Sequence, residues 1–163
     1  NLPDFRAAER CFMLITQTAG RAGRHGARGE VIVQTYNPEH YAVQTALRQD
    51  YEAFAAKETA LRRELFYPPF SRPVKLLFHN PSRTRAWQEA NAFVVAFRNV
   101  FSEQNGCAAI GPSPALIERE RGSYRFVVLI KTDALADVQS FLRTQGVHLR
   151  DDIAIDMDPI AIF

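Results

Sequence analysis

Apolar residues recur every three or four positions near the start of the chain. Between Asp4 and Ala19 the repeated positions are Phe5, Ala8, Phe12, Ile15 and Ala19. At about 3.6 residues per turn, these side chains fall on one side of a helix, where they can pack against a core. The pattern therefore predicts a helix over residues 4–19 that ends at the glycines that follow.

The next stretch predicts a strand and then a long helix. Residues 30–36 are rich in apolar and β-branched side chains, which is typical of a strand, and Asn37-Pro38 ends it. Residues 41–65 predict a helix that breaks near Gln49 or Asp50. Its expected apolar face is formed by Leu47, Tyr51, Phe54, Leu61 and Leu65.

Glu58 interrupts that apolar face. One interpretation is a polar contact with another domain. The favoured one is a partly buried carboxylate whose hydrogen bonds are satisfied, with Arg62 four residues later as a plausible partner.

A proline-rich segment over residues 66–73 marks the expected domain boundary. Its three prolines cannot continue a helix and stiffen the connection. We therefore expect one domain over residues 1–66 and a second over residues 67–163. A docking groove or a polyproline ligand is a weaker interpretation of the same residues.

The second half of the chain alternates between strand and helix patterns. Residues 74–79 predict a strand, Ser82 is a suitable N-cap, and a helix follows. The apolar stripe of that helix is Ala86, Ala90, Phe93, Phe97 and Val100, widened by Trp87 and Val94. Residues 107–110 then predict a short strand, and residues 111–114 a turn or bulge.

A hairpin and a last helix and strand complete the pattern. Residues 115–121 and 124–132 predict two strands joined by a Gly122-Ser123 turn. Asp133 is the expected cap of a helix with apolar positions Leu135, Val138, Phe141 and Leu142, and the last strand contains Ile153, Ile155 and Met157. The order β-α-β-β-α-β predicts an α/β (α+β) fold, the ferredoxin-like sandwich with two helices on one face of an antiparallel sheet.

Composition changes this picture little. Hydrophobic residues make up 47% and charged residues 23% of the chain, with a net charge of +2, as in ordinary globular proteins. The longest apolar run, residues 126–130, is too short to cross a bilayer, and no signal peptide pattern is present, so we expect a cytoplasmic protein. We separately expect it to be a monomer. Cys11 and Cys107 are far apart, which predicts buried thiols and no metal site.

The strongest chemical signal lies at the end of the first helix. Gln17, Arg21 and Arg24 recur at spacings of four and three, nearly opposite the apolar stripe, with Gly20 and Gly23 between them. A guanidinium binds phosphate through two hydrogen bonds and keeps its charge. The alternative is a solvated basic surface at a helix C-terminus, where the helix dipole favours arginine.

The same residues resemble a known motif. Gln-x-x-Gly-Arg-x-Gly-Arg is similar to the last helicase motif of superfamily 2. Residues 3–10, 29–35, 67–70 and 156–159 extend the likeness over the whole chain, which resembles the C-terminal part of the primosomal protein N′ (PriA) family of bacterial replication restart helicases.

That resemblance implies a parent protein that is an ATP-dependent 3′-5′ DNA helicase and assembles the primosome at stalled forks. Its implied partners are forked and single-stranded DNA, single-stranded DNA-binding protein and primosome proteins. Its implied cofactors are ATP, Mg²⁺ and a Zn²⁺ site outside this segment. Residues 1–66 would be the end of the second RecA-like lobe with a bridging helix, and residues 67–163 a domain similar to a small-subunit ribosomal protein.

The chain has no phosphate loop and no acidic magnesium motif, and it begins with Asn1, so we expect a piece of a longer enzyme that is inactive alone. By resemblance, Arg24 is the candidate arginine finger on the γ-phosphate and Arg21 a second phosphate contact. Gln17 would couple the nucleotide to DNA or to the attacking water, and Gly20 and Gly23 would allow close approach.

The predicted hairpin is a candidate surface for single-stranded nucleic acid. Arg119, Arg121, Tyr124 and Arg125 combine positive charge with an aromatic ring. Glu118 and Glu120 dilute that charge, which favours the alternative of an exposed hairpin with cross-strand ion pairs. Asp156 and Asp158 are expected to be structural, not metal ligands.

Two other function classes remain open. One is a nonenzymatic nucleic-acid or protein interaction module. The other is a small-molecule sensing domain, for which the sequence contains no ligand motif. No histidine has a serine, cysteine or carboxylate arranged beside it as in a hydrolytic site.

Overall fold

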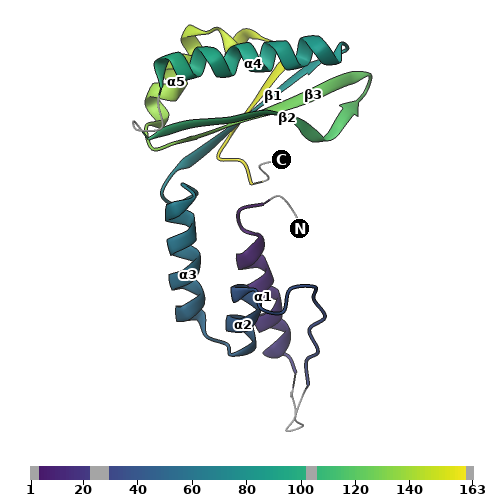
Figure 1. Cartoon of the computed structure of the whole chain (residues 1–163), viewed down its shortest axis with the longest axis vertical. Helices are drawn as coiled ribbons and strands as arrows, with labels where there is room; N and C mark the ends of the chain where they lie inside the picture. The colour runs from purple at the N-terminus through teal and green to yellow at the C-terminus, as the bar shows by residue number, and fades with distance from the viewer. Residues whose placement is uncertain (1–3, 23–29, 102–105, 161–163) are drawn as a thin grey trace. The chain divides into compact units, whose positions relative to one another are not determined.

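The computed structural model describes residues 4–22, 30–101 and 106–160 (Figure 1). The chain divides into two compact units, Asn1–Leu65 and Phe66–Phe163. This division lies one residue from the boundary expected from the prolines. No helix in the described residues is both long enough and apolar enough to span a membrane.

The first unit consists of α1 (Ala7–Ala19), α2 (Tyr41–Leu47) and α3 (Tyr51–Glu64). Its core is formed by Phe12, Ala42, Ala46 and Phe54. The rings of Phe12 and Phe54 stack with their centroids 4.3 Å apart, which joins α1 to α3. The helix predicted over residues 4–19 is confirmed from Ala7 onward.

The predicted break in the second helix is also confirmed. Gln49 adopts a positive φ of 54°, and the side chain of Asp50 accepts a hydrogen bond from the Ala53 main-chain N–H at 2.9 Å, which caps α3. The continuous apolar face predicted across this break is wrong. Because the chain changes direction there, Phe54 is buried whereas Leu47, Tyr51 and Leu65 are all more than half exposed.

The strand predicted over residues 30–36 is also wrong. Within the described part of the chain these residues have no strand partner and form neither helix nor strand. A strand exists only when a neighbour takes up its main-chain hydrogen bonds. The described strands all belong to the second unit, so the local pattern alone was insufficient.

The second unit contains one antiparallel sheet with the strand order β2-β3-β1-β4. Its strands are β1 (Arg72–Asn80), β2 (Cys107–Glu120), β3 (Ser123–Thr132) and β4 (Ile153–Met157). The helices are α4 (Arg83–Val100), α5 (Leu135–Thr144) and the short η3 (Val147–Leu149). Figure 1 shows α4 and α5 on the same face of the sheet. The predicted mixed α/β fold and its β-α-β-β-α-β order are confirmed.

Alternation along the strands builds the core of this unit. On β1, Val74, Leu76 and Phe78 are fully buried on the helix-covered face. They pack with the α4 stripe and with α5, where the Phe141 ring meets the rings of Phe93 and Phe97 edge-on. In the predicted stripe, Val94 is buried but Trp87 and Val100 are exposed. Val100 is the last residue of α4.

The two expected helix caps differ in outcome. The side chain of Ser82 accepts from the Arg85 N–H at 3.5 Å, so this cap is confirmed. Asp133 does not cap α5: the cap residue is Ala134, and no side chain caps the helix there. The helix begins one residue later than the pattern predicted, with Ala134 in the cap position. The hydroxyl of Thr132 accepts from the Ala134 N–H at 2.9 Å, which is a local turn bond and not a helix cap.

Candidate functional site

The predicted phosphate-contact residues lie at the C-terminal end of α1. Gln17 is exposed within the helix, Gly20 is the residue after its last turn, and Arg21 is exposed in the turn that follows. The Arg21 N–H donates to the Thr18 oxygen at 3.1 Å, so its backbone is held against the helix end. Gly23 and Arg24 lie outside the described residues.

The Arg21 guanidinium is accessible. In the described part of the chain no carboxylate lies within ion-pair distance of it. Gly20 has a right-handed φ of −67°, and a Cβ there would approach only the Thr16 and Gln17 oxygens, at 3.5 and 3.8 Å. The conformation of this helix end therefore does not itself require a glycine.

A buried polar network holds the three helices of this unit together. The Tyr41 hydroxyl donates to Glu58, Arg62 Nε donates to Glu58 at 2.7 Å, and Arg62 Nη2 donates to Glu9 at 2.8 Å. Burial and then the hydrogen bond to Glu58 raise the pKa of Tyr41. The favoured interpretation of Glu58 is confirmed: its carboxylate is buried and its hydrogen bonds are satisfied.

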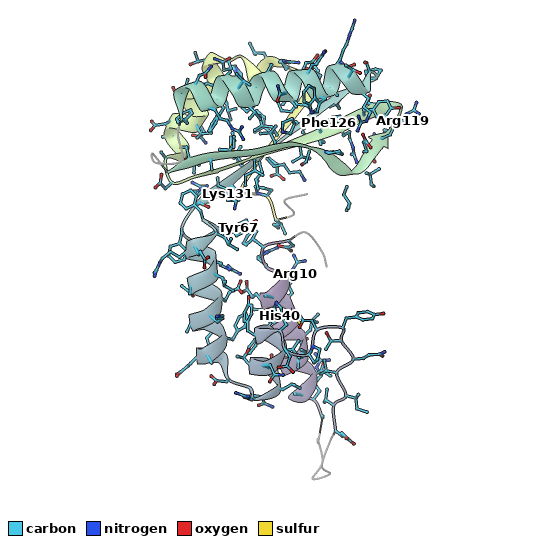
Figure 2. All side chains as sticks on the ribbon, in the orientation of Figure 1. Arg10, His40, Tyr67, Arg119, Phe126 and Lys131 are labelled. Carbon is cyan, nitrogen blue, oxygen red and sulfur yellow. The ribbon has the colours of Figure 1, made fainter. Side chains whose placement is uncertain are left out.

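The second candidate surface is the β2-β3 hairpin, where Figure 2 labels Arg119. Its turn is formed by Arg121 and Gly122, with φ angles of 49° and 83°, and Glu120 pairs with Ser123. The predicted Gly122-Ser123 turn is therefore wrong by one residue. A tight hairpin turn of this type needs positive φ at both central positions, which places the Arg121 side chain at the tip.

Arg119 and Tyr124 are directly opposite each other across the two strands. The Arg119 guanidinium carbon lies 5.2 Å from the centre of the Tyr124 ring, a cation-π contact. The ring also packs against the core of the second unit. Tyr124 therefore supports Arg119 and is not a fully exposed ring.

β2 is one strand where the sequence pattern predicted two, but its pairing with β3 is interrupted. Pro114 pairs with Phe126 and Arg119 pairs with Tyr124, so the four residues 115–118 lie opposite the single residue Arg125. We call residues 115–118 the β2 bulge. The earlier shift, between Ile110 and Ser113, confirms the bulge predicted over residues 111–114.

Arg125 holds the β2 bulge in place. Its Nε and Nη2 atoms donate to the Ile117 main-chain oxygen at 2.9 and 2.7 Å, and Nη1 pairs with Glu120. Only 19% of its side chain is exposed. The structure therefore places Arg125 as a support within the hairpin, separate from the exposed Arg121.

Both glutamates of the hairpin are neutralised. Glu120 pairs with Arg125, and Glu118 accepts from Arg83 Nε of α4 at 2.6 Å. Arg83 also lies over the Phe126 ring, 5.5 Å from its centre. Sequence reasoning missed Arg83 because it is far from Glu118 in the chain. The two glutamates are thus paired with Arg83 and Arg125. The other two arginines of the hairpin, Arg119 and Arg121, have no carboxylate partner among the described residues and leave two uncompensated positive charges.

Asp158 and Cys107 each have a side-chain partner within the second unit. Asp158 pairs with Arg72, whose Nε lies 3.0 Å from Oδ1, as expected of a structural aspartate. Within residues 4–22, 30–101 and 106–160, no group of three histidine, cysteine or acidic side chains could hold a metal ion. Cys107 is buried with its sulfur 3.0 Å from the Thr132 hydroxyl, and Cys11 is half-buried.

Comparison with known proteins gives several relatives named replication restart protein PriA. The proteins of Treponema pallidum and Bacillus subtilis are each 36% identical over 171 residues, and these alignments cover 98% of this chain. The Haemophilus influenzae protein is 33% identical over 161 residues, covering 96% of this chain. The chain spans only 25%, 20% and 22% of these three relatives, respectively.

A family model described as "Primosomal protein N C-terminal domain" matches residues 63–160. This region includes the whole sheet, both helices that cover it, and the β2-β3 hairpin. The match takes in more than half of the chain, and the chain therefore belongs to the primosomal protein N C-terminal domain family.

Proposed function

We propose that this chain is the C-terminal part of a bacterial replication restart protein that acts in the cytoplasm. Its parent is an ATP-dependent 3′-5′ DNA helicase that assembles the primosome at stalled forks, with single-stranded DNA-binding protein and primosome proteins as partners. The family match and the names of the relatives support this proposal. Because the chain spans a quarter or less of those relatives, motor activity is a property of the whole parent.

The observation that carries a direct role for this chain is the charge of the hairpin. Glu118 and Glu120 are both neutralised by arginines, so Arg119 and Arg121 provide a local surplus of positive charge. Arg121 lies at the tip of the turn, where a guanidinium can reach a phosphate. The hairpin therefore contacts the DNA backbone and contributes affinity without reading sequence.

The test of this contact is DNA binding by matched variants. We expect Arg121→Gln to weaken binding of the 163-residue chain to forked and single-stranded DNA, and to reduce the slope of log affinity against log salt by about 1. Arg143→Gln is the control, because Arg143 is also exposed, in the last turn of α5. Equal affinities and salt slopes for the two variants would contradict the proposal.

The arginine motif after α1 forms one side of the ATP site in the parent. ATP bound with Mg²⁺ supplies the phosphoryl group whose hydrolysis drives the motor, and any Zn²⁺ lies in the parent outside this segment. Arg21 contacts phosphate, Arg24 stabilises the charge that develops at the γ-phosphate, and Gln17 orients water or couples to DNA. The exposed side chains of Gln17 and Arg21 fit this role.

Steady-state ATP hydrolysis by the full-length parent tests this assignment. Removal of an arginine finger lowers kcat by about a thousandfold or more, so we expect that loss for Arg24→Ala with little change in DNA affinity. Arg48→Ala is the control, since Arg48 is an exposed arginine of the same unit that is not part of the motif. An unchanged kcat in Arg24→Ala would favour the alternative, a nonenzymatic interaction module.

A further inference from the structure

The β2 bulge exposes two large aliphatic side chains next to each other. Leu116 is 75% exposed and Ile117 is 58% exposed. A regular strand would place neighbouring residues on opposite faces of the sheet. Here, the four residues of the bulge lie opposite one residue of β3, so the pairing no longer draws either side chain into the core.

The exposed pair is held by a rigid framework. Arg125 fixes the Ile117 main-chain oxygen through two hydrogen bonds, and Arg83 fixes Glu118, the next residue, from α4. Bulges are commonly used to re-aim side chains. In this hairpin, charged contacts on the main chain and on the adjacent glutamate hold the segment that carries the exposed Leu116 and Ile117.

The charge beside the pair indicates what it contacts. Arg119 and Arg121, within five residues of Leu116, have no carboxylate partner among the described residues. The complementary partner is therefore an anion that also offers apolar surface. A nucleic acid meets both requirements, since phosphates lie outside and base faces become accessible wherever the stack is open.

A protein partner fits these residues less well. Hot spots in protein interfaces are enriched in tryptophan, tyrosine and arginine, and leucine is under-represented there. The only aromatic ring in residues 115–125 is that of Tyr124, and Arg119 covers it. By contrast, DNA-binding proteins insert leucine and isoleucine between base steps next to arginines.

We propose that Leu116 and Ile117 form an apolar wedge that enters the open base stack at a junction between single-stranded and double-stranded DNA. Arg119 and Arg121 contact the phosphates on either side of that step. This inference rests on the proposed DNA contact of the hairpin. It adds the two residues that enter the DNA and the step that they enter, at the junction of a fork, where one base step is already partly unstacked and insertion costs least.

The experiment uses forked DNA with the fluorescent base 2-aminopurine at the last base pair before the fork. Its fluorescence rises when the base unstacks. We expect the 163-residue chain to raise this signal at saturation, and to raise it little when the probe lies in the middle of a duplex. The double variant Leu116→Ser/Ile117→Ser should bind the fork with an affinity within about threefold of that of the unsubstituted chain, but it should no longer raise the fluorescence.

Leu149→Ser is the matched control. Leu149 is 78% exposed on η3, in the same unit, so its replacement removes similar apolar surface away from the hairpin and should leave the signal unchanged. Because Leu116 and Ile117 are mostly exposed, the double variant should keep its melting temperature. Leu116→Ser alone, at the more exposed position, should show a partial loss of signal.

The outcomes separate this inference from the proposed function. If Arg121→Gln binds DNA as tightly as the unsubstituted chain, the proposed DNA contact of the hairpin is wrong, and the proposed wedge is wrong as well. If Arg121→Gln weakens binding but Leu116→Ser/Ile117→Ser keeps the full fluorescence rise, the wedge is overturned and the DNA contact stands. Equal loss of affinity for fork, duplex and single strand in the double serine variant would also overturn the preference for a junction.

Discussion

Arg125 donates two hydrogen bonds to the main-chain oxygen of Ile117, from Nε at 2.9 Å and from Nη2 at 2.7 Å. One guanidinium thus satisfies a carbonyl that the bulge has removed from the β-ladder. The same side chain pairs with Glu120. Arg125 therefore determines the shape of the hairpin, whereas Arg119 and Arg121 supply its uncompensated charge.

The first prediction concerns this support. Lysine keeps the charge of Arg125 but cannot form two parallel hydrogen bonds to one oxygen. We expect Arg125→Lys to lower the free energy of unfolding by about 1–2 kcal/mol, as measured by urea denaturation. Amide exchange in residues 115–118 should be faster. Arg121→Lys should change the stability by less than about 0.5 kcal/mol. Equal stability of the two variants would show that Arg125 is not a support.

The second prediction concerns the network of the first unit. Arg62→Met leaves Glu58, which is 7% exposed, without its cation. Removal of one partner of a buried ion pair costs about 3 kcal/mol, so the opening free energy of α1 and α3 amides in native-state hydrogen exchange should fall by that order.

The control for this network is Lys57→Met, which removes an exposed cation from the same helix and should have little effect. The double variant Glu58→Gln/Arg62→Met should recover part of the loss, because no buried charge is left unpaired. If Arg62→Met and Lys57→Met were equally stable, the network would make no net contribution.

The third prediction is a pH dependence in the second unit. A hydrogen bond from Arg150 lowers the pKa of Asp152 from 3.8 to about 2. Because the folded-state pKa lies below the unfolded value, this stabilisation is complete above about pH 4 and is lost between about pH 4 and 2. With solvent screening, Asp152→Asn should lower stability by about 1 kcal/mol at pH 7.

The difference in stability between the unsubstituted chain and Asp152→Asn should disappear as the pH approaches 2, as measured by thermal or urea unfolding over that range. Asp151→Asn is the control, because Asp151 is an exposed neighbour outside the Arg150 contact. A stability difference between the unsubstituted chain and Asp152→Asn that stays constant over this pH range would mean that the effect does not come from the carboxylate charge.

The fourth prediction compares two glycines with positive φ. At Gly111, φ is +107° and an added Cβ would lie 2.7 Å from the Val127 oxygen of β3. At Gly146, φ is +65° and no atom lies within 4 Å of the same position. Gly111→Ala should cost about 2–4 kcal/mol of unfolding free energy, and Gly146→Ala about 1 kcal/mol. Equal costs would mean that the β2-β3 contact at Gly111 relaxes freely.

Local patterns were sufficient to predict most elements of the fold. The period of the apolar residues around Phe12 and Phe93 gave α1 and α4, and the polar pair before Tyr51 gave the break between α2 and α3. Ser82 was correct as a cap because its partner is three residues away. Each of these features depends on neighbours within about one helical turn.

Features that need a distant partner were predicted less well. The segment 30–36 has strand-like residues, yet no strand in the described chain pairs with it. Asp133 does not cap α5, because the helix begins one residue later than the pattern predicted and Ala134 takes the cap position. The hairpin turn lies one residue from its predicted position. Its place depends on the register in which the two strands pair, with Glu120 opposite Ser123, and the sequence of each strand alone does not specify that register.

The sequence by itself determined the order of helices and strands in the second unit, the core-facing stripes of α1 and α4 and the motif with Arg21, because these follow from residue types at short spacing. The tertiary structure alone decided which hairpin charges are neutralised. Arg83 reaches Glu118 only after α4 packs on the sheet, and Arg125 reaches Ile117 only after the bulge forms. Charge compensation and side-chain exposure depend on distances through space, which the spacing of residues along the chain does not contain.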